Sequence, residues 1–313
     1  MAPRAPGRPL VRAARLRIGD VVAVTSPAGP VASSRLDAGL AVFQAWGLPV
    51  RVMANVRGQH PRLSYLSSDD AVRAADFMQA WCDPSVAAVF CVRGGYGAQR
   101  MVDLLDWEAL AAAGPKVLVG FSDVTAVHQA FATRLGLSTI HGPVVTSLGA
   151  GDEASREHLR GLLFERSAGL SLTTPSPAPA IRRGRAQGVL VGGNLALVAA
   201  ELGTAHSRPA VNSIAVLEDV GEELYRVDRL LTQLLRSGWF DGVRAIAFGQ
   251  FTDCGSAESL RYLFEERLGP LDVPILWNLP LGHADRNLAV PLGVPVTLDA
   301  DLGTLVLRDS ALV

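Results

Sequence analysis

A serine at the end of a buried strand has the clearest potential for chemistry. The run Val117–Gly120 is apolar, and Phe121-Ser122-Asp123 leads directly into a helical segment at Val124–Leu135. A serine on such a turn presents its hydroxyl at the carboxyl end of the strand, where the first helical N–H groups also point. This geometry suits a nucleophile with an oxyanion site beside it. The alternative is that Ser122 caps the helix while Asp123 interacts with its dipole, and the segment alone leaves both open.

A serine nucleophile needs a base, which is usually histidine. His283 lies in an irregular loop, Leu281–Asn287, where functional residues are common, although it could equally be a structural residue. His141, at a strand end before Gly142-Pro143, is the competitor. The other four histidines are weaker candidates: His128 lies six residues into the Ser122 helix, His60 lies in a polar loop, and His158 and His206 are predicted to be surface residues.

The base in turn needs an orienting carboxylate. The apolar strand Ile214–Leu217 runs straight into Glu218 and Asp219, and buried acids are costly unless they have partners. Side chains alternate along a strand, so the two acids cannot face one site. Helix capping or a salt bridge to Arg226 or Arg229 would explain Asp219 better than Glu218.

A glycine-rich loop, Arg93-Gly94-Gly95-Tyr96-Gly97, follows the apolar strand Val86–Val92. Glycines there allow positive φ and bring backbone N–H groups close to a ligand. The loop matches neither GxxxxGK[ST] nor GxGxxG, so nucleotide binding is a weak interpretation, and a plain tight turn is the alternative.

The elements that must position these residues alternate between strand and helix in the first half of the chain. Near-continuous apolar strands between helices predict a parallel sheet covered on both faces, with ligands at its carboxyl edge. Residues 166–188 are rich in Pro, Gly and Arg, and we expect them to link an N-terminal domain, 1–165, to a C-terminal domain, 189–313. The expected strands are Val21–Thr25, Val50–Met53, Val86–Val92, Val117–Gly120, Ile214–Leu217, Ala245–Phe251, Val294–Leu298 and Leu305–Leu307, with another near Ile275; the expected helices are Leu36–Trp46, Ala71–Trp81, Val124–Leu135, Leu195–Leu202, Tyr225–Leu235 and Leu260–Leu268.

Length and composition agree with a two-domain globular protein. The chain has 313 residues, of which 49% are hydrophobic and 19% charged, with a net charge of −1. That charge gives no reason to expect a nucleic-acid or membrane partner. Three dispersed cysteines without CxxC, and no ligand-spaced cluster, predict no disulfide framework, metal or cofactor. The Arg- and Pro-rich N-terminus lacks a secretory signal, so a cytoplasmic location is expected.

Taken together, these segments resemble the LD-carboxypeptidase family of serine peptidases, which includes murein tetrapeptide carboxypeptidases and microcin-immunity peptidases. Each motif is weak alone, but seven in the right order are specific, with Phe121 in place of the usual tyrosine. The similar segments are Gly19-Asp20 with Ser26-Pro27, Arg93–Gly97, Gly120–Ala126, His141–Pro143, Gly192–Leu195, Leu217–Asp219 with Tyr225–Arg229, and Gly282-His283 with Asn287, Pro291 and Gly293.

The resemblance implies a flavodoxin-like N-terminal domain and a smaller, β-rich α+β C-terminal domain. It implies a Ser–His–Glu triad of Ser122, His283 and Glu218, with the active site between the domains and a homodimeric assembly. The oxyanion donors would be the backbone N–H groups of Asp123 and of the glycine loop at Gly94 and Gly95, with Tyr96 beside them.

Three other readings remain. An α/β-hydrolase esterase has the same Ser, acid, His order, but Val124 stands where its GxSxG elbow needs glycine. A catalytically silent ligand-binding module would not bring the three residues together. The third alternative lies within the family and concerns the substrate. The substrate is either a murein tetrapeptide, cut at the L,D-bond before D-Ala, or, in this alternative, a peptidyl- or aminoacyl-nucleotide amide.

A nucleotide should need an aromatic platform for its base. Residues 150–188 contain Phe164 but no Trp or Tyr, which favours the murein peptide. The candidates for binding a substrate carboxylate are Arg93, Arg226, Arg229 and Arg286, which the sequence does not separate.

Overall fold

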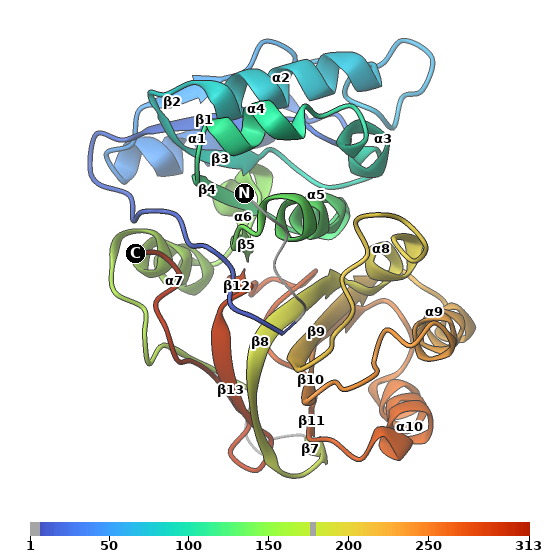
Figure 1. Cartoon of the computed structure of the whole chain (residues 1–313). Helices are drawn as coiled ribbons and strands as arrows, with labels where there is room; N and C mark the ends of the chain where they lie inside the picture. The colour runs from blue at the N-terminus through green and yellow to red at the C-terminus, as the bar shows by residue number, and fades with distance from the viewer. Residues whose placement is uncertain (1–6, 176–179) are drawn as a thin grey trace.

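Two β-sheets with their helices make up the protein. The computed structural model describes residues 7–175 and 180–313. In Figure 1 the first sheet and its helices, in blue to green, lie above the second sheet, in yellow to red. Residues 1–6, part of the segment on which the expectation of no secretory signal rests, and Ser176–Pro179, in the predicted linker, lie outside the described residues.

The first sheet has the flavodoxin strand order. Its order is β12-β5-β4-β3-β1-β2. Read from the β2 edge, strands β1 to β5 therefore have the order 2-1-3-4-5. These five are parallel, whereas β12 is antiparallel to β5. The flavodoxin-like prediction is therefore confirmed, with one added edge strand from the C-terminal part of the chain. The bounds are β1 (Val21–Thr25), β2 (Val50–Val52), β3 (Val86–Cys91), β4 (Val117–Gly120), β5 (Thr139–His141) and β12 (Val290–Leu292).

Two groups of helices cover this sheet. Successive residues of β4 are all buried, and because they point to opposite faces, both faces must be covered. One group consists of α1 and α6, which pack together. In the other group α2 packs on α3 and α4, and α3 packs on α5. A buried aromatic cluster of Phe77, Trp81 and Phe131 fills the second group. The bounds are α1 (Ser33–Ala45), α2 (Asp70–Cys82), α3 (Ala98–Val102), α4 (Trp107–Ala112), α5 (Thr125–Ala130), α6 (Val145–Ala150) and α7 (Glu153–Phe164).

The second sheet is mixed. Its order is β6-β14-β13-β8-β9-β10-β11-β7, with β8 to β11 parallel and the outer pairs antiparallel. The predicted β-rich α+β C-terminal part is confirmed. The bounds are β6 (Ser171–Thr173), β7 (Ala180–Arg182), β8 (Arg185–Asn194), β9 (Ser213–Val220), β10 (Ala245–Thr252), β11 (Ile275–Leu276), β13 (Pro295–Asp299), β14 (Thr304–Leu307), α8 (Leu195–Ala200), α9 (Leu224–Arg236) and α10 (Ala257–Leu268).

Strand β9 separates two hydrophobic cores. Ile214 and Val216 pack into the core shared with the first sheet, whereas Ala215 and Leu217 pack into a second core under α8, α9 and α10. Because faces alternate, the next two residues, Glu218 and Asp219, also turn to opposite sides.

The segment predicted to link the two domains contains short strands. Residues 166–188 include β6, β7 and the start of β8. β6 and β7 are the two edge strands of the second sheet, three residues each, and they bury few side chains. Such edges carry no apolar run, so their sequence resembles a loop. The domain limits themselves stay a prediction.

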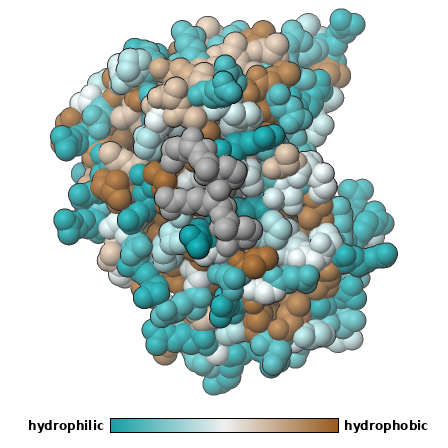
Figure 2. Space-filling model, in the orientation of Figure 1, coloured by the Kyte–Doolittle hydropathy of each residue, from teal (hydrophilic) through white to brown (hydrophobic). Residues whose placement is uncertain are grey.

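The outer surface is mixed in polarity. On the face in Figure 2, hydrophilic residues surround the outline and hydrophobic residues are scattered between them, as on most folded proteins. Within the described ranges, no helix combines the length and apolarity that a membrane crossing requires.

Candidate active site

Ser122 stands on a strained turn between β4 and α5. Its φ is 64°, one of five positive values among non-glycine residues of the described chain. The 3₁₀ turn Ser122–Val124 follows, and no side chain caps it. The helix-cap alternative for Ser122 is therefore wrong. A left-handed serine at a strand-to-helix turn lifts its hydroxyl out of the backbone, as in nucleophile elbows.

The hydroxyl of Ser122 meets His283. His283 Nε2 lies 3.0 Å from Ser122 Oγ, and His283 Nδ1 lies 2.7 Å from Glu218 Oε2. The backbone N–H of His283 also donates to Glu218 Oε2, at 3.2 Å. Three residues that the sequence singled out thus form one chain of hydrogen bonds, in which a carboxylate fixes the ring nitrogen on the far side from the hydroxyl.

Burial makes the Glu218–His283 pair strongly coupled. Glu218 is 0% exposed, whereas the His283 side chain is 20% exposed. Burial alone would raise the pKa of Glu218, but the hydrogen bond and charge of His283 outweigh it and lower that pKa. Burial alone would lower the pKa of His283, but its hydrogen bond to Glu218 and that carboxylate's charge raise it above the ordinary value.

Asp219 serves another part of the fold. Its Oδ1 accepts from Asn194 Nδ2 at 2.9 Å, and its Oδ2 accepts from the backbone N–H of Ala196 at the start of α8, also at 2.9 Å. Burial raises its pKa to about 6. The expected alternation of the two acids is confirmed, but Asp219 supports α8 and not the helix that begins near Tyr225.

The second sheet closes against the Ser122 turn at a glycine contact. A Cβ at Gly193, in β8, would lie 2.7 Å from Thr125 Oγ1, in the first turn of α5. The backbone N–H of Asn194 donates to the same oxygen at 3.0 Å. This close approach brings the carboxyl end of β9, with Glu218, to the carboxyl end of β4.

Local contacts hold the His283 loop in place. Gly282 N–H donates to Asn287 Oδ1 at 2.9 Å, and Thr252 Oγ1 donates to the His283 carbonyl. A Cβ at Gly282 would lie 2.5 Å from Glu218 Oε2, so the loop can pass the carboxylate only with glycine there. The Phe121 ring lies 4.7 Å from the His283 ring, centroid to centroid.

The glycine loop packs against Ser122. A Cβ at Gly94 would lie 2.8 Å from Ser122 Oγ and 3.4 Å from the Asp123 backbone nitrogen. The Asp123 carboxylate accepts from Ala98 N–H at 2.8 Å, which ties the loop to the Ser122 turn, and burial raises its pKa to about 6. Gly95 has a φ of 114°, so a side chain there would be strained. Tyr96 is 47% exposed and packs on Tyr65, 5.8 Å away.

The remaining histidines do not reach Ser122. His141 and His128 are fully buried, and burial lowers the pKa of each, to about 4 and about 3. His60 lies in a polar loop, as expected, beside Asp69. The expectation that His206 is a surface residue is wrong, because it is 5% exposed beside Asp103. His158 is half-buried and bonds the Ala289 carbonyl.

Two cavities adjoin the His283 side chain. We call the first, of about 380 Å³, the glycine-loop lobe; it is lined by Ser122, Gly94, Gly95, Arg35 and Arg93. We call the second, of about 810 Å³, the acidic lobe; it is lined by Asp152, Asp285, Thr252 and Asn287. Phe121, Ser147 and His283 line both.

The four arginines proposed as carboxylate ligands separate in the structure. Arg93 lines the glycine-loop lobe, whereas Arg286 pairs with Asp152 at 2.9 Å. Arg226 pairs with Glu222, and Arg229 stacks on Tyr225. Arg35, at the start of α1, also lines the glycine-loop lobe. The sequence analysis did not single it out, because its neighbours in the sequence do not distinguish it from other surface arginines.

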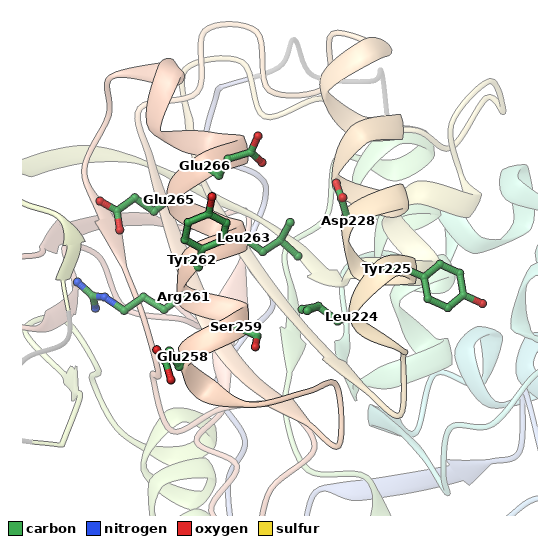
Figure 3. Close-up of a pocket in the computed structure, with 10 residues that line it drawn as sticks. All are labelled: Leu224, Tyr225, Asp228, Glu258, Ser259, Arg261, Tyr262, Leu263, Glu265 and Glu266. Carbon is green, nitrogen blue, oxygen red and sulfur yellow. The ribbon is translucent and has the colours of Figure 1, made fainter.

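A third cavity lies away from these residues. It has about 710 Å³ and lies between α9 and α10, where Leu224 and Leu263 extend into the space between the helices (Figure 3). Acidic residues and the exposed Tyr225 and Tyr262 surround it. It contains none of the residues that meet Ser122, so the chemistry belongs to the two lobes at His283.

Comparison with known proteins gives one consistent family. The model of the LD-carboxypeptidase N-terminal domain matches residues 22–142, and that of the C-terminal domain matches residues 187–298. A Streptomyces coelicolor protein named as a candidate carboxypeptidase is 54% identical over 97% of this chain and 98% of its own. The murein tetrapeptide carboxypeptidase of Pseudomonas aeruginosa is 38% identical over 90% of this chain and 93% of its own.

A solved structure with the same fold is the microcin C7 self immunity protein MccF in complex with aspartyl sulfamoyl adenosine. Its TM-score is 0.86 at 24% identity, and the match covers 97% of this chain and all of that one. At this identity the likeness concerns the fold. The two domain models, matched in order over most of the chain, and the full-length relatives establish that this protein belongs to the LD-carboxypeptidase family.

Proposed function

We propose that the protein is a serine carboxypeptidase that releases the terminal D-Ala of a murein tetrapeptide by cutting the preceding L,D-bond. The observation that carries the proposal is the contact of Ser122 Oγ with His283 Nε2, while His283 Nδ1 contacts the buried Glu218. Family membership makes the chain a hydrolase of the carboxypeptidase class; the residue roles and the substrate are the proposal.

In the acylation step, Ser122 Oγ attacks the carbonyl carbon of the L,D-peptide bond. His283 Nε2 takes the hydroxyl proton and then passes it to the leaving nitrogen, so D-Ala departs with a neutral amine and an ester remains on Ser122. Glu218 keeps the Nδ1–H tautomer in place and stabilises the charged imidazole. Glu218 itself stays deprotonated, because His283 lowers the pKa of Glu218 against the effect of burial.

Backbone donors stabilise the negative oxygen of the tetrahedral intermediate. The N–H of Asp123 stands at the start of a helical turn, where it has no intrahelical acceptor. The N–H groups at Gly94 and Gly95 belong to the loop that packs on Ser122. One such donor is worth about 2.7–4 kcal/mol. In the second half-reaction His283 takes a proton from water, the hydroxyl attacks the ester, and Ser122 regains its proton.

The choice between the two substrates rests on the relatives and on the lobes. The Pseudomonas aeruginosa relative, at 38% identity, is named for the murein tetrapeptide, whereas MccF, with its sulfamoyl adenosine ligand, is 24% identical. Among the described lining residues of both lobes, the aromatic rings are Phe121 and His283, with no Trp or Tyr. Neither lobe offers a second broad ring on which a base would stack.

The proposal is tested by assaying the purified protein on both substrates, with Ser122→Ala as the control. Free D-Ala is measured after incubation with the tetrapeptide, and the free amino acid after incubation with an aminoacyl sulfamoyl nucleotide. We expect D-Ala release that the control lacks. Hydrolysis confined to the nucleotide would replace the murein assignment with the immunity type.

Two further expectations remain predictions. A homodimeric assembly comes from the family resemblance, and a cytoplasmic location comes from the composition of the N-terminal segment. Analytical ultracentrifugation checks the first, since a sedimenting mass near that of one chain at micromolar concentration would exclude it. Cell fractionation checks the second.

A further inference from the structure

We propose that Arg35 and Arg93 form the subsite for the free carboxylate of the substrate's last residue, and so make the enzyme an exopeptidase. The inference rests on the proposed function, because it presumes that Ser122 cuts a peptide bond. It places one side of that bond in each of the two lobes. The terminal residue lies in the glycine-loop lobe, and the longer remainder of the peptide lies in the larger, acidic lobe.

The two lobes differ in charge. The glycine-loop lobe is lined by two arginines and by no acid among the described residues. The acidic lobe is lined by two aspartates and by no arginine or lysine among them. A peptide that lies across Ser122 therefore meets two arginines on one side of the reacting bond. On the other side it meets Asp285, and Asp152 already pairs with Arg286. A terminal carboxylate matches the first side.

Arg35 has no partner for its charge. Within the described chain, its side chain makes neither an ion pair nor a hydrogen bond, although it is exposed next to the lobe. The acid two residues along the helix, Asp37, already pairs with Arg57 at 2.6 Å. Arg35 is thus free to bind an anion without first breaking another contact.

Arg93 is held in position but not neutralised. Its Nε donates to the Gly94 carbonyl at 3.1 Å, and its Nη1 donates to the Pro30 carbonyl at 3.0 Å. Both acceptors are uncharged, and no carboxylate pairs with this guanidinium in the described residues. The two carbonyls fix the plane of the group and leave Nη2 to donate, so little side-chain entropy is lost when a carboxylate binds.

Other arginines near the site are already engaged. Arg286 pairs with Asp152, and Arg226 and Arg229 line neither lobe. An enzyme that cuts one residue from a carboxyl terminus must recognise that terminus, and a buried or partly buried carboxylate needs a cation. Among the arginines that the sequence and the lobes bring forward, Arg35 and Arg93 alone combine a place beside Ser122 with an unpaired charge.

The test uses two peptides that differ only at the end, the tetrapeptide with a free terminal carboxylate and the same peptide with a terminal amide. For the parent enzyme, kcat/KM should be at least about tenfold higher for the carboxylate, because a hydrogen bond between two charged groups is stronger than one to a neutral amide. Arg35→Gln should remove most of this preference through KM, and should leave kcat/KM for the amide within about twofold.

Three further variants sharpen the result. Arg35→Lys keeps the charge without the planar fork and should retain part of the preference. Arg93→Gln should also lose the preference, but it can lower kcat for both peptides because Arg93 holds the glycine loop. Arg236→Gln, on an exposed arginine in the last turn of α9 and outside both lobes, is the matched control and should keep the parent's preference.

A parent enzyme that cleaves the tetrapeptide while Arg35→Gln and Arg93→Gln both keep the full carboxylate preference would overturn this inference and leave the proposed function intact. If the parent cleaves neither peptide, the proposed function fails. The carboxylate subsite is then tested separately, by measuring the binding of a small ligand. In that case saturation-transfer NMR with N-acetyl-D-alanine and its amide is the readout. The parent should bind the acid and not the amide, and equal binding by the parent and Arg35→Gln would overturn the subsite as well.

Discussion

One carboxylate oxygen of Glu218 receives two contacts from the same residue. Oε2 lies 2.7 Å from Nδ1 of His283 and 3.2 Å from its backbone nitrogen. The second contact fixes the loop that carries the ring, so Glu218 sets both the tautomer and the place of His283. The fully buried carboxylate is also the reason that the pKa of His283 is raised in spite of its own burial.

This raised pKa predicts the acid limb of the pH profile. A general base must be neutral, so activity is lost as pH falls through the pKa of His283. The midpoint of the kcat/KM limb should lie above 6.5, the ordinary histidine value. Glu218→Gln should move the midpoint to lower pH, because the carboxylate charge is gone. A parent midpoint below 6.5 would show that another group controls the limb.

The two neighbouring acids should respond differently to amide substitution. Glu218→Gln can turn an N–H toward the imidazole and favour the wrong tautomer, so kcat should fall by about 10⁴-fold with KM little changed. Asp219→Asn should act on stability, by about 1–3 kcal/mol, because it places an amide donor against Asn194 Nδ2 or Ala196 N–H. Steady-state kinetics and urea unfolding separate the two. A dead Asp219→Asn beside an active Glu218→Gln would reverse the assignment.

Gly94→Ala should damage catalysis more than folding. The added Cβ would lie 2.7 Å from Ser122 Cβ and 2.8 Å from Oγ, so either the loop or the serine must move. We expect kcat to fall at least about 10²-fold, the loss of an oxyanion donor.

Gly161→Ala is the matched control for this substitution. That glycine lies inside α7, and an added Cβ would have nothing within 4 Å, so stability should rise by roughly 0.5–1 kcal/mol with unchanged kinetics. A Gly94→Ala enzyme with the parental kcat would show that the glycine loop does not contribute to catalysis.

Much of the fold could be predicted from strands with continuous apolar runs. Strands β3 and β4 are buried on both faces, except at the half-buried Ala87, so their sequences are continuous apolar runs and both were predicted as strands of a parallel sheet. The edge strands β6 and β7 bury little and their sequence resembles a linker. Strand β12, three residues long, pairs with β5 from the first half of the chain, and no local pattern encodes such a distant contact.

The candidate site divides in the same way. Ser122 and Glu218 were predicted because each follows an apolar strand, where side chains at the carboxyl end become available. Arg35 lies on an exposed helix and was missed, because its role depends on which loop packs beside it. His206 was predicted to be exposed but is buried, and the sequence could not show this because its burial depends on partners distant in sequence, such as Asp103.

The three contacting residues should behave as a unit. Ser122→Ala and His283→Ala should each lower kcat by about 10⁴-fold or more, and the double variant should lose little further, because either change already removes the activated hydroxyl. His141→Ala should keep most activity and lose stability, since it empties a fully buried site. Additive losses at Ser122 and His283 would indicate separate roles.

The most direct measurement is covalent labelling of the intact protein with a fluorophosphonate, followed by mass spectrometry of its peptides. The account predicts a single adduct on Ser122, labelling that slows at least about 10²-fold in His283→Ala, and no adduct in Ser122→Ala. A parent protein whose Ser122 stays unmodified, or that labels as fast without His283, would contradict the claim that Ser122 is the nucleophile activated by His283.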